Sequence, residues 1–157
     1  MNTEYAIENA KSMLETNLAS TLIILQNEAS SSIVTPTPQE YIIGEYDPET
    51  LTLYPAVLIW SPKSNKVNDQ YGYQTRSIWI RVLVWITENN LEYLHRFLIR
   101  YSDAVLRVLR DESNWIAGLH NPVVENTDNT DLYKQQTVGY AQGTLIEGTV
   151  DYMLGEN

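Results

Sequence analysis

The two histidines are the residues of this chain that could most simply act as a general base or bind a metal. His95 lies within a long amphipathic segment, and His120 follows Gly118 in a stretch without apolar periodicity. Neither belongs to a metal-ligand motif such as HExxH, and the chain has no cysteine. The sequence therefore predicts neither a metal site nor a cofactor, and it favours a surface or interface position for His95.

Neighbouring carboxylates are the second group that could do acid–base chemistry. Three pairs are Asp47 with Glu49, Asp111 with Glu112, and Asp128 with Asp131. Each pair lies in or beside a predicted loop, where a solvated charge is the ordinary explanation. There is also no phosphate-binding glycine motif and no nucleophile motif near His120. We predict that the chain is not an enzyme; a small hydrolase is the enzyme class that the sequence excludes least.

Length and composition predict one domain over residues 1–157. A chain of 157 residues can bury about two-thirds of the surface that its unfolded form exposes. Without cysteines, packing alone must stabilise the fold, as in a reducing compartment. The N-terminal residues carry no basic leader before an apolar run, and nowhere do about 18 uninterrupted apolar residues occur. We expect a soluble protein that is not exported and does not enter a membrane.

The charge of the chain is strongly negative and unevenly distributed. Twenty acidic and ten basic residues give a formal charge of −10, which opposes sequence-specific binding to a phosphate backbone. Residues 61–112 hold six acids and eight bases, whereas residues 1–60 and 113–157 hold 14 acids and two bases together. Opposite patches of this kind suit contacts between copies of the chain. A solvated surface with chance clustering explains the same pattern.

Hydrophobic periodicity predicts the order of the elements. Residues 6–28 form an amphipathic helix, and residues 40–46 and 52–61 form strands. Further strands are predicted at 132–138 and 139–153. Together with the central strand and helix described next, this order predicts an α+β fold: a mainly antiparallel twisted sheet with an N-terminal helix and a long central helix packed on it.

The central strand, residues 77–87, is apolar on both faces. One face is aliphatic, and the other carries Trp79, Arg81, Leu83 and Trp85. Such a strand is either central in a sheet that is covered on both sides or covered on its second side by another subunit. We expect Trp79 and Trp85 to be buried by a partner or by the first helix.

The helix predicted at 89–112 begins at a possible capping box, Asn89 with Glu92. Its apolar face should dock on the sheet, while a charged stripe lies opposite, with Ile99 and Leu106 between the two faces. The stripe consists of Arg96, Arg100, Asp103, Arg107 and Arg110. Two interpretations remain: a solvated face with pairs inside the helix, or a contact with the acidic segment 40–49 of another copy.

The segment 62–75 is polar and is predicted to be a long hairpin loop. Loops of this length are uncommon unless they are functional or disordered. It carries Lys63, Lys66, Tyr71 and Tyr73. Tyrosines in a polar loop suit a surface that becomes buried on association. We therefore interpret it as a contact element.

The order of these elements resembles that of the tail terminator or tail completion proteins of tailed bacteriophages. The resemblance covers roughly residues 1–153 and includes the Tyr-Pro-Ala-Val run at 54–57, the polar hairpin, the apolar strand, and the helix that begins with Asn-Asn-Leu-Glu at 89–92. It implies an α+β subunit of a ring, usually a hexamer, that terminates the tail tube and joins it to the head connector. It also implies an acidic lumen through which DNA passes without sequence-specific binding.

The resemblance implies a location in the virion, after assembly in the host cytoplasm, and the tail tube and connector proteins as partners. It carries no catalytic residues. In such a ring we expect Arg96, Ile99, Arg100, Leu106 and Arg107, with Trp79 and Trp85, to form the subunit contact. Lys63, Lys66, Tyr71 and Tyr73 would reach an adjacent ring. The sequence leaves open a head-completion or stopper protein of the neck and a cytosolic protein-binding adaptor.

Overall fold

The computed structural model describes residues 3–62, 66–70, 73–135 and 139–154, and they form an α+β fold. The helices are α1 (Thr3–Glu28) and α2 (Leu91–Arg110), with short 3-10 helices at Pro48–Thr50 and Glu112–Asn114. The strands are β1 (Glu40–Ile43), β2 (Ala56–Trp60), β3 (Lys66–Gln70), β4 (Tyr73–Glu88), β5 (Leu119–Asn129), β6 (Tyr133–Gln135) and β7 (Gly139–Leu154).

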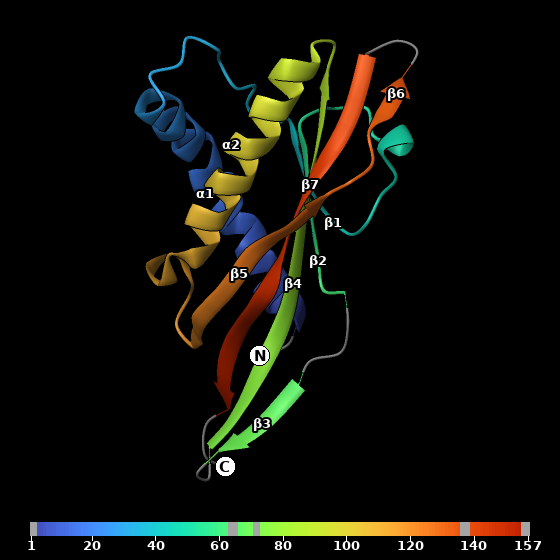
Figure 1. Cartoon of the computed structure of the whole chain (residues 1–157). Helices are drawn as coiled ribbons and strands as arrows, with labels where there is room; N and C mark the ends of the chain where they lie inside the picture. The colour runs from blue at the N-terminus through green and yellow to red at the C-terminus, as the bar shows by residue number, and fades with distance from the viewer. Residues whose placement is uncertain (1–2, 63–65, 71–72, 136–138, 155–157) are drawn as a thin grey trace.

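The strands form one mixed sheet in the order β1-β2-β4-β7-β5. β3 pairs with β4, and β6 pairs with β7. Among the described strands, only β1 and β2 run parallel, so the sheet is mainly antiparallel. Both helices lie on one face of the sheet, whereas the segment that joins β1 to β2 lies on the other side (Figure 1). The predicted fold class is confirmed.

The main core lies between the helices and the sheet. The aliphatic face of β4 packs there against the apolar sides of α1 and α2. The buried β4 side chains are Ile78, Ile80, Val82, Val84 and Ile86. Because these residues alternate along the strand, β4 turns its other face away from the helices. That face is partly covered by the chain itself, since Leu51, Leu58, Leu83 and Trp85 form a second buried cluster.

The predicted loop at 62–75 is mostly a β-hairpin. Lys66 pairs with Ser77, and Gln70 pairs with Tyr73, so five residue pairs join β3 to the beginning of β4. The polar composition was misleading because β3 pairs with the first residues of β4 through backbone groups, and such pairing does not require an apolar alternation. With the adjoining ends of β4 and β7, β3 forms an arm that extends past the two helices (Figure 1). We call residues 66–70, 73–77 and 153–154 the arm.

Two other sequence predictions require correction. The sequence predicts no strand at 119–129, because Pro122 and many polar residues hide it. β5 is nevertheless a strand at the edge of the sheet, with register shifts between His120 and Val123 and between Asn126 and Asp128. Edge positions and bulges tolerate such residues. The cap of α2 is Asn90 rather than Asn89: its side chain accepts from the backbone N–H groups of Glu92 and Tyr93.

Gly148 allows β5 to cross closely over β7. A Cβ atom at this position would lie 2.0 Å from the carbonyl oxygen of Val123 and 2.6 Å from the Cα atom of Val124. Backbone atoms cannot move aside as a flexible side chain can. We predict that Gly148→Ala lowers the free energy of unfolding by about 1–3 kcal/mol, the usual cost of overpacking. Urea denaturation measures it, with Thr149→Ala as the control; equal stability of the two variants would contradict this account.

Two tyrosines connect other segments to the core and should make the fold sensitive to alkali. Tyr101 donates to the carbonyl of Pro36, and Tyr41 donates to that of Leu14. Burial, then the charge of Glu15, raises the pKa of Tyr41 from 10.0 to about 12. Burial, then the neighbouring Tyr41, raises the pKa of Tyr101 as well.

Because these pKa values are raised in the folded state, the unfolded chain loses protons first. The stability that both groups contribute is complete below pH 10 and falls as the pH rises from 10 through 12. We expect the free energy of unfolding to fall over this range, measured by urea denaturation at each pH. Tyr41→Phe should reduce the pH dependence. The same dependence in that variant would contradict the assignment to Tyr41.

Candidate assembly surfaces

The charged stripe of α2 is largely satisfied within the subunit. Arg96 forms an ion pair with Glu92 on the same helix, with 2.9 Å between nitrogen and oxygen. Arg107 forms another at 2.7 Å with Glu28 at the end of α1, and this contact lowers the pKa of Glu28 and raises that of Arg107. Arg110 donates to the carbonyl of Val124 at 3.0 Å. The stripe is therefore less positive than its sequence suggests.

Arg100 is a structural residue rather than an exposed contact residue. Its side chain donates to the carbonyl of Ile33 at 2.6 Å and to the hydroxyl of Thr35 at 2.9 Å, and the residue is 9% exposed. Burial, then the nearby Arg96, lowers its pKa. It thereby joins α2 to the connector between α1 and β1. Its own chain already binds and buries most of this side chain, and its expected place in a subunit contact stays a prediction.

The apolar edge of the stripe lies where the sequence predicted it. Ile99 is 49% exposed, while Leu106 is half-buried and packs against the main core. Ile99 lines a groove of about 450 Å³ between α2 and the end of α1, together with Leu25, Ala29 and Asp103. An exposed isoleucine in a groove with charged walls can contact another protein. We call Ile99, Leu106, Arg96 and Arg107 the helix surface.

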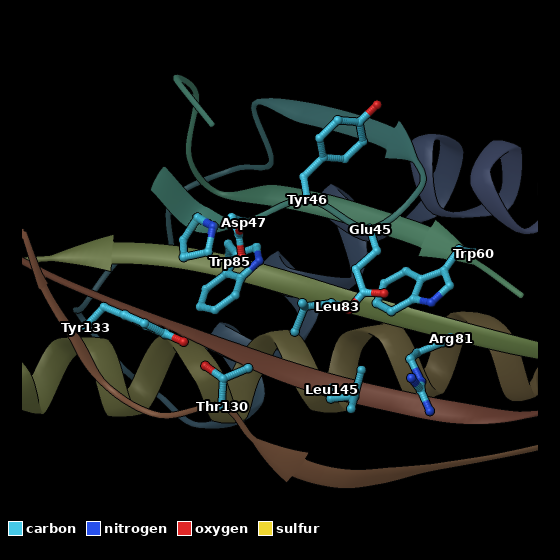
Figure 2. A pocket seen from close by; sticks show the side chains of 11 residues that line it. Glu45, Tyr46, Asp47, Trp60, Arg81, Leu83, Trp85, Thr130, Tyr133 and Leu145 are labelled. Atoms are coloured by element: carbon cyan, nitrogen blue, oxygen red, sulfur yellow. The ribbon is translucent and has the colours of Figure 1, made fainter. Parts of the chain in front are cut away.

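A second candidate surface lies on the opposite face of the sheet. A pocket of about 500 Å³ opens there between β4 and the segment that follows β1. Figure 2 shows Glu45, Tyr46 and Asp47 above the β4 side chains, with Tyr133 and Thr130 on the other side. The remaining lining residues are Pro48, Trp60, Arg81, Leu83, Trp85 and Leu145. We call this the outer-face pocket.

The two strand tryptophans differ in their surroundings. Trp85 is only 4% exposed, packs beside Leu51 and Leu83, and meets Tyr133 edge to face at 5.8 Å. The expectation that a partner or the first helix buries Trp85 is wrong, because the chain itself covers it on the face away from both helices. Trp79 is partly buried on that same face of β4. Its role in a subunit contact stays a prediction.

Gly143 of β7 makes room for the floor of the outer-face pocket. A Cβ atom there would come within 2.8 Å of Leu83 and 3.2 Å of Trp85. Thr130 lies beside it, and its hydroxyl accepts from the N–H of Gly143 at 2.9 Å. The absence of a side chain in β7 thus lets two large β4 side chains lie flat on the sheet.

Two of the four candidate inter-ring residues lie on described strands. Lys63 and Tyr71 lie outside the described residues. The backbones of Lys66 and Tyr73 belong to β3 and β4 and so place these residues on the arm. Their contacts with another ring stay predictions.

The two histidines lie on different elements of the fold. His95 is exposed on α2, and His120 lies on β5. Within the described ranges, no group of three or more His, Cys, Asp or Glu residues could hold a metal ion. Neither described helix has a stretch that is apolar and long enough to cross a membrane.

Sequence reasoning missed the outer-face pocket. Trp60 and Arg81 come from different strands but are paired in register, and the guanidinium of Arg81 lies 5.8 Å from the centre of the Trp60 ring. Arg81 also donates to Glu147 of β7 at 2.6 Å. The alternation of β4 placed Arg81 on this face, but the register that brings Trp60 and Glu147 to it was not visible in the sequence.

The sequence matches no protein-family model and no curated protein. Among solved structures, one similar chain comes from the virion of a native gene transfer agent (GTA) particle. The identity is 10% and the TM-score is 0.41, over 88% of this chain and 94% of that chain. At these values the similarity does not establish a common fold or function.

Removing the Arg100 side chain should destabilise the fold. Arg100→Ala would leave the carbonyl of Ile33 and the hydroxyl of Thr35 without their donor. We expect a loss of about 1–3 kcal/mol in the free energy of unfolding, as for a buried hydrogen-bonding group that loses its partner. Arg96→Ala is the matched control on the same helix. It should change the free energy of unfolding by less than about 1 kcal/mol, since the ion pair of Arg96 is exposed. Both values come from urea denaturation; similar losses would contradict a special role for Arg100.

Proposed function

We propose that this chain is a structural virion protein of a phage neck or tail end. Copies of it form a ring, usually of six, that terminates the tail tube and joins it to the head connector. The proposal combines the resemblance in element order with the surfaces described above. No chemistry is assigned to the chain, and it acts by making contacts.

The observation that carries the proposal is the arm. The paired ends of three strands, β3, β4 and β7, continue beyond the helices and so lack a helical layer to cover them (Figure 1). Isolated two- or three-stranded ribbons are marginal in water unless something packs on them. Contact with a neighbouring subunit or ring would supply that packing.

The helix surface is the second contact of the proposed ring. It lies on α2, apart from the arm, so each subunit offers two different surfaces for contact with its neighbours. A contact between two different patches is heterologous, and it closes into a ring when the rotation between copies allows it. Ile99 supplies exposed apolar area, and the paired arginines supply a polar rim.

The acidic charge suits the passage of DNA. A formal charge of −10 per subunit repeats around a ring and repels the phosphate backbone. DNA would therefore pass through the lumen without adhering to it. The virion is the location that follows, with assembly in the host cytoplasm.

A protein-binding adaptor is the second candidate function. The outer-face pocket favours it, because aromatic side chains around a hollow of about 500 Å³ suit the capture of one foreign protein. A stopper or head-completion ring would use the same surfaces at another level of the neck. An adaptor differs from both rings in that it would stay a monomer or dimer.

The mass in solution tests the proposal directly. Native mass spectrometry over a range of concentrations, with negative-stain images, should give a closed ring of about six subunits, alone or after addition of purified tail tubes. A monomer or dimer under both conditions would contradict the ring and favour the adaptor.

The helix surface can be tested by placing a charge on it. We predict that Ile99→Asp together with Leu106→Asp leaves a folded monomer, because two buried carboxylates would oppose the contact. Ile99→Asp alone should weaken assembly as well, and it spares the core on which Leu106 packs. Val34→Asp is the control, since Val34 is 70% exposed outside this surface. Circular dichroism checks folding; an unchanged ring would remove the helix surface from the contact.

A further inference from the structure

The outer-face pocket carries negative charge that the subunit does not neutralise. Glu45 and Asp47 are exposed at its rim. Among the ion pairs of the described residues neither carboxylate takes part, and Asp47 makes no side-chain cap to the 3-10 helix that follows it. Arg81 is the cation of the lining, but it is paired with Glu147. Two uncompensated carboxylates therefore face the hollow.

The walls of the pocket are aromatic. Trp60, Tyr46, Trp85 and Tyr133 line it, and Tyr46 and Tyr133 are each more than 40% exposed. The negative faces of such rings attract a cation, and nearby carboxylates strengthen the attraction. A hollow that combines these groups fits a lysine or arginine side chain, whose stem packs on the rings while its head reaches the carboxylates.

The floor of the pocket holds a hydrogen-bond donor with no acceptor among the described residues. This donor is the indole nitrogen of Trp85, which is buried. Buried donors are normally satisfied, so an exception requires an explanation. A backbone carbonyl of a bound peptide that reached this nitrogen would be a suitable acceptor. The pocket thus offers acceptors at its rim and a donor at its floor, which matches a peptide with a cationic side chain.

The subunit's own cations are mostly occupied. Lys11, Arg81, Arg96 and Arg107 are in ion pairs with carboxylates of the same chain, and Arg100 and Arg110 donate to backbone carbonyls. A second copy of this acidic chain therefore has these six cations already engaged. We infer that the complementary charge comes from another protein.

We propose that the outer-face pocket binds an extended segment of a different protein through a lysine or arginine side chain held by Glu45, Asp47 and the aromatic walls. The identity of the partner rests on the proposed function: in the neck or tail, this segment belongs to a neighbouring component. The pocket then gives each subunit a fixed contact with a basic partner, separate from the contacts that close the ring.

The test uses the full chain, labelled with ¹⁵N, and a defined probe. The peptide acetyl-Gly-Gly-Arg-Gly-Gly-amide is titrated while the four indole N–H signals are followed, each assigned by Trp→Phe substitution. We expect saturable shifts of the Trp60 and Trp85 signals and none of the Trp115 signal, which reports a buried indole bonded to Leu109. The Trp85 N–H should move downfield and exchange more slowly. The same peptide with glutamine in place of arginine should not bind.

Glu45→Gln with Asp47→Asn should raise the dissociation constant at least about ten-fold, because the attraction is electrostatic. Glu4→Gln with Glu8→Gln is the control, because it removes the same charge at two exposed positions of α1. It should leave the dissociation constant nearly unchanged. If both double variants weakened peptide binding equally, the net charge of the protein would explain the effect, and the proposed site would be overturned. Absence of shifts at Trp60 and Trp85 would overturn it as well.

The outcomes separate this inference from the proposed function. A ring that forms normally while the peptide fails to bind would overturn the pocket and leave the ring intact. Peptide binding by a chain that stays monomeric, with or without tail tubes, would support the pocket and contradict the ring. Loss of the wild-type ring in Glu45→Gln with Asp47→Asn would mean that a second copy occupies the pocket, contrary to the inference.

Discussion

The antiparallel pairing of β4 with β7 is the interaction on which the rest of the structure depends. Fifteen residue pairs run without interruption from Gln74 with Leu154 to Glu88 with Tyr140. The other strands are added to this pair: β2 and β3 to β4, and β5 and β6 to β7. Because the register of a strand fixes which side chains share a face, this one pairing decides both the helix-covered core and the outer face. It also explains the arm, since the pair is longer than the helices that cover it.

The two faces of the sheet have different roles for a physical reason. On one face, α1 and α2 bury a continuous aliphatic layer, and such layers stabilise a fold through the area they remove from water. On the other face, the chain covers only the part around Leu83 and Trp85 and leaves aromatic and charged groups around a hollow. Most of the buried apolar core thus lies on the first face, while part of the second face stays exposed and available for contacts.

Electrostatics direct these contacts. The basic residues that made the middle of the sequence look positive are mostly held by carboxylates and carbonyls of the same subunit. The net charge that remains is acidic. An acidic surface opposes the approach of another copy at long range and attracts basic partners. In the proposed ring, apolar contacts would therefore hold the copies together, while charge would select the other partners.

The amino-acid sequence by itself determined the two helices, the central strand and the α+β class, because the 3.6-residue and two-residue periods of buried positions are local properties of the chain. It also located Ile99 at the edge of the apolar face of α2. Only the tertiary structure decided that residues 66–70 and 73–77 belong to an arm and that Arg100 binds the connector between α1 and β1. It alone decided that Trp85 is covered from within and that Trp60, Arg81 and Glu147 meet. These facts depend on pairing between residues far apart in sequence, such as Arg81 with Glu147, and neither periodicity nor composition encodes which distant partners meet.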